Sequence, residues 1–141
     1  MSNYESDILN NKHILLIEDD YDVREILKCY IEYMGTDQIT LASNGQDALT
    51  LLHEDNLQFD LIISDQNMSK LSGVELLEKI KENNSKHCRT PFILMSGFFD
   101  PKLKCTLEKA KKAQGFLEKP FTYQELFALV GKIYDHKSYV N

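Results

Sequence analysis

Apolar residues in this chain form short continuous runs, which alternate with longer stretches where they recur every three or four residues. A short continuous run is typical of a strand covered on both faces, and the longer spacing is typical of an amphipathic helix. The pattern predicts five strands and five helices in strict alternation. The predicted strands span residues 13–17, 38–42, 61–63, 91–95 and 115–118, and Ser64 and Asp65 close the third of them.

A predicted helix follows each strand, and several of these helices have recognisable ends. Asp100 followed by Pro101 is a favourable start for the fourth helix, Thr122 caps the fifth, and Gly35 ends the first. The apolar stripes are predicted to be Val23, Ile26, Leu27, Tyr30, Ile31 and Met34; then Ala48, Leu51 and Leu52; then Val74, Leu77 and Ile80; then Leu103, Leu107 and Ala110; and finally Leu126, Leu129, Val130 and Ile133.

Strict alternation of strands and helices indicates an α/β domain. Such a domain has a parallel sheet with right-handed crossovers and helices on both faces. The sequence contains no internal repeat, low-complexity segment or linker. We therefore expect one domain over residues 12–136, with flexible tails at residues 1–11 and 137–141.

Composition narrows the classes of function. The chain has 141 residues, enough for one domain with a buried core, and its net charge of -6 argues against direct nucleic-acid binding. No apolar run approaches the roughly 20 residues that a membrane helix needs, and the first residues lack the features of a secretory signal. The three cysteines form no CxxC motif. This pattern favours a reduced, cytoplasmic setting without membrane contact.

Charge is distributed unevenly along the chain. Residues 1–70 carry 14 acidic and 4 basic residues, whereas residues 71–141 carry 8 acidic and 12 basic residues. The imbalance is either scatter over a solvated surface or the mark of a basic surface that binds an acidic partner. The lysines predicted on the two flanks of the fourth helix are Lys102, Lys109 and Lys112 on one side and Lys104 and Lys111 on the other.

Charged and hydroxyl side chains stand at the ends of four predicted strands. Ligands of open α/β sheets bind beyond these carboxyl ends. Each such residue alone is usually a helix cap or a turn residue, but their coincidence at one sheet edge favours a functional site. In chain order they are Glu18, Asp19 and Asp20, then Asp65, then Ser96, then Lys119.

The chemistry of this edge suits phosphoryl transfer. Crowded carboxylates repel one another unless a cation lies among them, and a set of oxygen donors suits Mg²⁺. Phosphoryl transfer needs little beyond positioning and charge stabilisation, to which Lys119 and the Ser96 hydroxyl can contribute. Because the pattern includes no separate general base, Asp65 is the best candidate nucleophile.

The blocks ILLIEDD, DLIISDQNM, KLSGVELL, FILMSG and GFLEKPF follow one another in a way that resembles the receiver domain of bacterial two-component response regulators. The resemblance runs from about Lys12 to Asp135 and is to single-domain, chemotaxis-regulator-like members. It implies a flavodoxin-like doubly wound sheet in the order 2-1-3-4-5 with five helices. It also implies a phosphoprotein that is phosphorylated on Asp65 by a histidine kinase or histidine phosphotransfer protein and then controls a partner protein. Such a protein is no enzyme beyond its own phosphorylation and dephosphorylation.

The resemblance also implies roles for the residues around Asp65. Asp19 and Asp65 bind Mg²⁺ directly, together with the backbone carbonyl of Asn67. Glu18 acts through water, and Asp20 lies outside the site. We expect these acids to lie at one edge of the sheet.

The implied switch connects the phosphoryl group to a distant surface. Lys119 pairs with the phosphoryl group, Ser96 moves toward it, and Phe116 turns inward. The surface of the fourth helix, fifth strand and fifth helix then changes, and we expect its lysines to bind an acidic partner. The Lys119–Pro120 peptide bond is implied to be cis.

Two serines depart from the family pattern, and two residues bear on the lifetime of the phosphoryl group. Ser69 stands where the family usually has proline, and Ser72 where it usually has an acidic or similar polar residue, so the loop after Asp65 is less well predicted. In the family the positions of Asn67 and Phe98 flank the path of the hydrolytic water. The bulk of Phe98 predicts a long-lived phosphoryl state.

Other functions fit parts of the pattern. A phosphorylation-independent pseudo-receiver would bind proteins only, although such modules generally lose a site residue. A metal-dependent phosphatase or nuclease commonly needs a second acid where this chain has Asn67, and a flavin phosphate would be repelled by the acids after the first strand. Met1 and the short segment after Asp135 favour a stand-alone regulator, either monomeric or a phosphorylation-dependent dimer.

Overall fold

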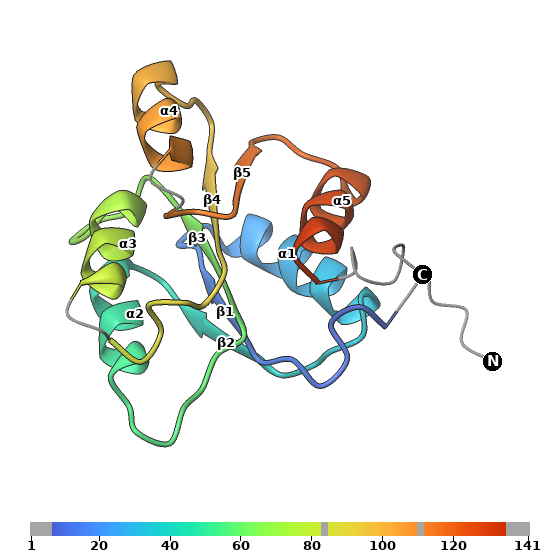
Figure 1. The fold of residues 1–141 in the computed structure, drawn as a ribbon. Helices are drawn as coiled ribbons and strands as arrows, with labels where there is room; N and C mark the ends of the chain where they lie inside the picture. The colour runs from blue at the N-terminus through green and yellow to red at the C-terminus, as the bar shows by residue number, and fades with distance from the viewer. Residues whose placement is uncertain (1–6, 83–84, 110–111, 135–141) are drawn as a thin grey trace.

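The computed structural model describes residues 7–82, 85–109 and 112–134. Within these residues, five parallel strands form one sheet in the order β2-β1-β3-β4-β5, which confirms the predicted topology (Figure 1). The strands are β1 (Ile14–Ile17), β2 (Ile39–Ala42), β3 (Leu61–Asp65), β4 (Phe92–Ser96) and β5 (Gly115–Glu118). The helices are α1 (Tyr21–Tyr33), α2 (Gly45–Leu52), α3 (Gly73–Lys81), α4 (Pro101–Lys109) and α5 (Tyr123–Tyr134).

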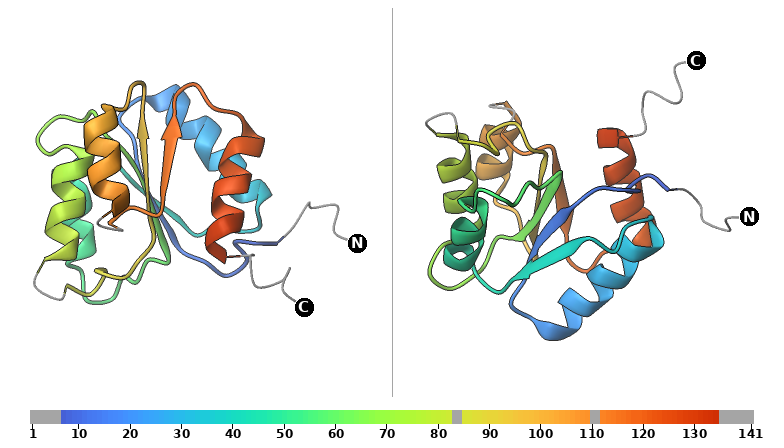
Figure 2. Two further views of the ribbon diagram at one scale, coloured as in Figure 1. Left: turned by 45° about the horizontal axis from the view of Figure 1, so that its top comes forward. Right: turned by 90° about the horizontal axis from the view of Figure 1, so that it is seen from below.

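Helices cover both faces of the sheet, as predicted. The helices α1 and α5 lie on one face, and α2, α3 and α4 lie on the other (Figure 2). Because successive strand residues point to opposite faces, each face has its own apolar core. In β1, Ile14 and Leu16 face the α1/α5 core, whereas Leu15 and Ile17 face the opposite core. The strands read as continuous apolar runs because both faces are covered.

Side-chain caps define where the helices that border the site begin. The Ser72 hydroxyl accepts a hydrogen bond from the Glu75 N–H at 3.1 Å, and Glu75 accepts one from the Ser72 N–H at 2.9 Å. Thr122 and Glu125 form the same reciprocal pair at the start of α5. Each pair satisfies two backbone donors that the helix leaves free. Ser72, a departure from the family pattern, therefore gives α3 a well-defined start.

Ile26 is a correction to the predicted apolar stripe of the first helix. It is 51% exposed, whereas Leu27 and Ile31 are buried against the sheet. Residues 26 and 27 lie about 100° apart around a helix, so both cannot face the core equally. Ile26 instead lines a mostly apolar pocket together with Val23 and Phe121.

The packed domain begins earlier than expected. Leu9, which falls in the predicted N-terminal tail, is fully buried, and its N–H donates to the Met34 carbonyl at 3.0 Å. Leu9 packs in the core on the α1/α5 face of the sheet. Two adjacent apolar residues, Ile8 and Leu9, lie outside any periodic stretch, so the sequence does not predict that they pack in the core. Residues 137–141 lie outside the described residues.

The helix α4 is shorter than predicted. It ends at Lys109, and Lys112 lies in the connection to β5, where its N–H donates to the Leu107 carbonyl at 3.2 Å. The placement of Lys112 on a flank of the helix was therefore wrong. Ala110 and Lys111, and the side chain of Lys109, lie outside what the structure describes.

Candidate functional site

Three acidic side chains meet at the carboxyl edge of the sheet. Glu18 and Asp19 follow β1, and Asp65 ends the neighbouring strand β3. One carboxylate oxygen from each lies within 4.8 Å of the other two. Glu18 is only 1% exposed and Asp65 only 5%, whereas Asp19 is exposed. The cluster is thus buried at its base and open to solvent at Asp19.

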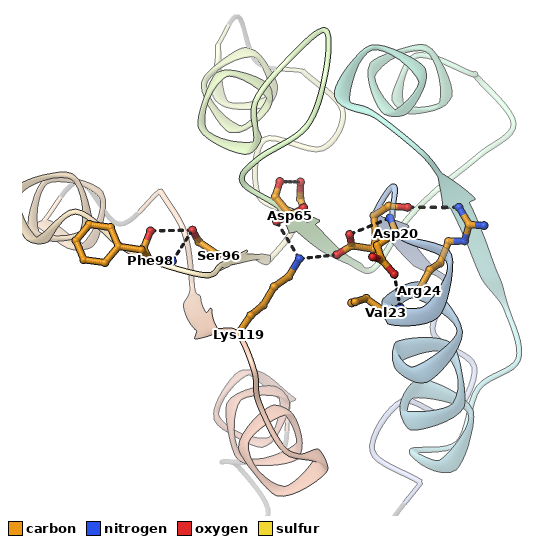
Figure 3. Close-up of polar contacts among 9 residues, drawn as sticks. Asp20, Val23, Arg24, Asp65, Ser96, Phe98 and Lys119 are labelled. Carbon is orange, nitrogen blue, oxygen red and sulfur yellow. Dashed lines mark hydrogen bonds and ion pairs between the residues drawn. The ribbon is translucent and has the colours of Figure 1, made fainter.

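Lys119 brings a positive charge to this cluster from the connection between β5 and α5 (Figure 3). Its Nζ lies 3.0 Å from Glu18 Oε1 and 3.3 Å from Asp65 Oδ1. Its backbone N–H donates to the Ser96 carbonyl at 2.8 Å, which joins this connection to the end of β4. The Lys119–Pro120 bond is cis, as the resemblance implied. The ammonium group lies between two carboxylates that repel each other.

Burial and charge shift the pKa values of Glu18 and Lys119. Burial raises the pKa of Glu18, and the Asp65 charge adds to this, while hydrogen bonds from Lys119 and the Asp20 N–H act in the opposite direction. For Lys119, burial alone would lower the pKa. Its hydrogen bond to Glu18 and the charges of Asp65 and Glu18 outweigh burial, so the pKa is raised. The lysine is thereby kept as an ammonium group that can hold an anionic oxygen.

Asp20 lies beside the cluster and caps α1. Its Oδ1 accepts a hydrogen bond from the Val23 N–H at 3.0 Å, and its own N–H donates to Glu18 Oε2 at 3.2 Å. Arg24, which the sequence analysis did not single out, donates from Nη1 to the Glu18 carbonyl at 3.4 Å and to Ser43 Oγ at 3.5 Å. Arg24 therefore supports the backbone at Glu18. The only indication of this role in the sequence was an arginine in the first turns of a helix that follows an acidic pair.

Ser96 stands at the same sheet edge, but its hydroxyl is occupied by its own loop. Ser96 Oγ donates to the Phe98 carbonyl at 2.8 Å and accepts from the Phe98 N–H at 3.2 Å. The Phe98 side chain is 74% exposed and lies on the far side of Ser96 from Asp65 (Figure 3). The structure therefore brings Ser96 to the site edge and places the Phe98 ring away from the Asp65 carboxylate.

Phe116 lies in β5 on the face covered by α4, and it is half-buried. The Phe99 ring meets it edge to face, with ring centroids 5.5 Å apart and an interplanar angle of 87°. Lys104 Nζ lies 5.7 Å from the centroid of the Phe116 ring. Both neighbours belong to the segment that follows Ser96.

The loop after Asp65 is held to α3 by Gln66, which no sequence pattern singled out, and by Gly73, the glycine of the block KLSGVELL. Gln66 Oε1 accepts a hydrogen bond from the Val74 N–H at 2.9 Å, and the Gly73 N–H donates to the Gln66 carbonyl at 3.0 Å. A Cβ atom at Gly73 would lie 2.6 Å from the Asp65 carbonyl oxygen, so only glycine fits there. Asn67 follows in the exposed part of the loop.

The family model of the response regulator receiver domain matches residues 14–131. The chain belongs to this family. The receiver domain is 30% identical over 124 residues to chemotaxis protein CheY of Pseudomonas aeruginosa, an alignment that covers 86% of this chain and 95% of that protein. It is 31% identical over 126 residues to the transcriptional regulatory protein CrdR of Helicobacter pylori, covering 88% of this chain and 55% of that protein. Among solved structures, the chemotaxis response regulator CheY4 of Vibrio cholerae matches with a TM-score of 0.74 and 26% identity, over 86% of this chain and 98% of that one.

Membership makes this chain a CheY-like receiver domain of two-component systems with the flavodoxin-like receiver fold. Receiver domains are in general phosphorylated signalling proteins rather than enzymes, and they interact with histidine kinases and downstream targets. This membership favours the receiver interpretation over the phosphatase, nuclease and flavin alternatives. Among the described residues, no helix has both the length and the apolar character needed to cross a membrane.

The acidic cluster fits the metal of the family. Receiver domains bind Mg²⁺ in an acidic pocket, and here three carboxylates offer oxygen atoms within 4.8 Å of one another. Mg²⁺ prefers oxygen donors, uses one or two carboxylates, and keeps several waters. The exposed position of Asp19 leaves room for those waters at the open side of the cluster.

Proposed function

We propose that this receiver domain accepts a phosphoryl group on Asp65 from the phosphohistidine of a histidine kinase or histidine phosphotransfer protein. It then changes the surface of α4, β5 and α5 and so controls a partner protein. The observation that carries this proposal is the position of Asp65 beside two further carboxylates and 3.3 Å from the Lys119 ammonium. A phosphoryl acceptor needs this combination of a nucleophilic oxygen and nearby positive charge.

The proposed reaction moves the phosphoryl group from nitrogen to oxygen. A carboxylate oxygen of Asp65 attacks phosphorus and forms an O–P bond, while the P–N bond to the histidine ring breaks and its electron pair returns to the ring nitrogen. Lys119 can hold a phosphoryl oxygen because its Nζ already lies beside Asp65 Oδ1. Asp65 ends a buried strand and is itself 5% exposed, so the strand presents its carboxylate at the edge of the sheet.

Mg²⁺, when bound, supplies positive charge to the carboxylates and to the phosphoryl oxygens. Asp19 and Asp65 would hold it directly, together with the backbone carbonyl of Asn67. Glu18 is the most buried acid of the cluster and is already paired with Lys119 at 3.0 Å, which suits a role through water.

Ser96 and Phe116 form the proposed switch. The Ser96 hydroxyl would exchange the Phe98 carbonyl for a phosphoryl oxygen, and the Phe116 ring would turn inward. Such a change biases a surface with two arrangements rather than building a new one. The exposed Lys102 and Lys104 of α4 would then present positive charge to an acidic partner surface, or to a second copy in a phosphorylation-dependent dimer.

Intact mass measurement after incubation with acetyl phosphate and Mg²⁺ tests the proposed function. We expect the protein to gain one phosphoryl group, only with Mg²⁺, and the Asp65→Asn variant to gain none. Asp22→Asn, which removes an exposed acid of α1, is the matched control and is expected to be labelled like the wild type. No gain in mass, with beryllofluoride also failing to bind, would instead favour the phosphorylation-independent pseudo-receiver.

A further inference from the structure

We propose that Phe99 is a positioning residue that couples the Ser96 hydroxyl to the Phe116 ring. The inference rests on the proposed function, because it concerns how phosphorylation of Asp65 reaches the surface of α4, β5 and α5. Three consecutive contacts support it: from Ser96 to the Phe98 backbone, from Phe98 to Phe99 along the chain, and from the Phe99 ring to Phe116.

The first contact holds the Ser96 hydroxyl in its resting position. Ser96 Oγ donates to the Phe98 carbonyl at 2.8 Å and accepts from the Phe98 N–H at 3.2 Å (Figure 3). A hydroxyl has one proton, so it cannot donate fully to this carbonyl and to a phosphoryl oxygen at once. Engagement of the phosphoryl group therefore opens the turn. The freed backbone groups can bind water, because Phe98 is exposed.

The second link is covalent, because Phe98 and Phe99 are consecutive residues joined by a peptide bond. The Phe98 carbonyl carbon is bonded to the Phe99 nitrogen, so reorienting the Phe98 carbonyl also moves Phe99. Gly97 gives the turn room to do this, since a Cβ atom built there would meet nothing within 4 Å. Glycine also has the widest choice of backbone conformations. Movement of Ser96 toward Asp65 therefore displaces Phe99.

The third contact passes this displacement to Phe116. The two rings meet edge to face at 5.5 Å, a preferred geometry for aromatic pairs, and both pack against the core beneath α4. Lys104 Nζ, a charged neighbour of the Phe116 ring, lies 5.7 Å from the ring centroid and belongs to the same segment after Ser96. The resting orientation of Phe116 therefore depends on this segment, and Phe99 provides its aromatic contact.

Removing the Phe99 ring has a defined consequence under this proposal. The edge-to-face contact stabilises the resting arrangement, so its loss shifts the domain toward the switched arrangement before any phosphoryl group binds. Because coupling is reciprocal, the site then binds a phosphoryl mimic more tightly. We expect Phe99→Leu to raise the affinity for beryllofluoride in the presence of Mg²⁺ by about two- to tenfold.

Fluorine NMR of protein containing fluorophenylalanine measures the coupling directly. The Phe116 signal is assigned by its loss in Phe116→Leu, and spectra are recorded with Mg²⁺ before and after addition of beryllofluoride. Phe127→Leu is the matched control, because Phe127 is also half-buried and stacks on Tyr123 on the opposite side of the sheet. Phe99→Met is measured beside Phe99→Leu so that the result does not depend on the folding of one variant, and Phe99→Tyr restores the ring.

In the wild type, Phe127→Leu and Phe99→Tyr, we expect beryllofluoride to move the Phe116 signal. In Phe99→Leu and Phe99→Met, we expect the signal to lie near the switched position without beryllofluoride, together with tighter binding. A wild-type response and unchanged affinity in both of these variants would overturn the coupling role and leave the proposed function standing. Failure of the wild type to bind beryllofluoride would overturn the proposed function and this inference together.

Discussion

At the scale of single residues, the metal site depends on which of two adjacent acids points into the cluster. Asp19 and Asp20 are both exposed, yet Asp19 joins Glu18 and Asp65, whereas Asp20 caps α1 through the Val23 N–H. Asparagine removes the charge of an aspartate but remains a good N-cap. The two positions therefore offer a matched comparison in which only one change touches the proposed Mg²⁺ site.

The prediction is that Mg²⁺ raises the melting temperature of the wild type and of Asp20→Asn, and has little effect on Asp19→Asn. At a Mg²⁺ concentration about one hundred times Kd, binding to the native state adds about 2.7 kcal/mol to the free energy of unfolding. Thermal unfolding with and without Mg²⁺ measures the difference. Equal loss of the Mg²⁺ effect in both variants would contradict the assignment of Asp19 as a ligand.

The lifetime of the phosphoryl group gives a second prediction at this scale. The Phe98 ring lies away from Asp65 in this structure, so it can hinder the hydrolytic water only after its loop moves with Ser96. We expect Phe98→Ala to lose its phosphoryl group severalfold faster than the wild type, as followed by intact mass after removal of acetyl phosphate. Tyr33→Ala, which removes another exposed aromatic ring, should decay like the wild type. Equal decay in Phe98→Ala would show that this ring does not protect the acyl phosphate.

At the scale of helices and strands, the sequence predicts both the elements and the edge of the sheet where the site lies. The elements follow from local sequence patterns, and the position of the site follows from the order and direction of the strands. Buried strands read as apolar runs, Thr122 is a recognisable cap, and parallel strands bring Asp65 and Lys119 to one edge whatever the loops do. The exposure of Ile26 depends on how α1 is rotated about its axis relative to the sheet. The spacing of apolar residues defines this rotation only to within one residue. The contact of Ser96 with the Phe98 backbone depends on a rotamer and a turn, which no sequence pattern specifies.

A buried histidine before β4 makes the stability of this region depend on pH. His87 is 2% exposed, its Nε2 accepts a hydrogen bond from the Phe59 N–H at 3.1 Å, and its ring lies 5.5 Å from that of Phe59. Burial lowers the pKa of His87, and the positive charge of Lys86 lowers it further. Protonation would also remove the acceptor for the Phe59 N–H.

We therefore predict that the free energy of unfolding falls as pH decreases below about 6.5, the ordinary histidine pKa. In that range the unfolded chain takes up a proton that native His87 does not, and above it the contribution is fully present. Denaturant unfolding between neutral and mildly acidic pH measures the slope. The slope should be shallower in His87→Gln, which keeps an acceptor but cannot gain a proton, and unchanged in His53→Gln, which alters an exposed histidine. A wild-type slope in His87→Gln would exclude His87 as the source.

At the scale of the whole molecule, charge separates the two proposed binding regions. The phosphoacceptor edge carries the acidic cluster of Glu18, Asp19 and Asp65, and α4 presents the exposed lysines Lys102 and Lys104. Opposite charge on a partner would speed its association with α4 and make binding sensitive to salt.

The wild type loaded with beryllofluoride is first used to capture its protein partner. We predict that the double variant Lys102→Glu, Lys104→Glu binds this partner more weakly than the wild type does, and that the difference is largest at low salt. Labelling by acetyl phosphate should remain, because neither lysine belongs to the acidic cluster. Lys28→Glu combined with Lys79→Glu makes the same charge change on α1 and α3 and should bind the partner like the wild type. Equal affinity of both double variants at low salt would rule out the basic surface as the partner site.

The proposed phosphoryl transfer depends on Asp65 as the acceptor. After reaction with acetyl phosphate and Mg²⁺, borohydride reduces an acyl phosphate to an alcohol, which converts a phosphorylated aspartate to homoserine. Tandem mass spectrometry of the resulting peptides then locates the modified residue. The structure of the site predicts homoserine at position 65 and at no other acid. Reduction of Glu18 or Asp19 instead, or a phosphoryl group that borohydride does not remove, would contradict the assignment of Asp65 as the phosphoacceptor.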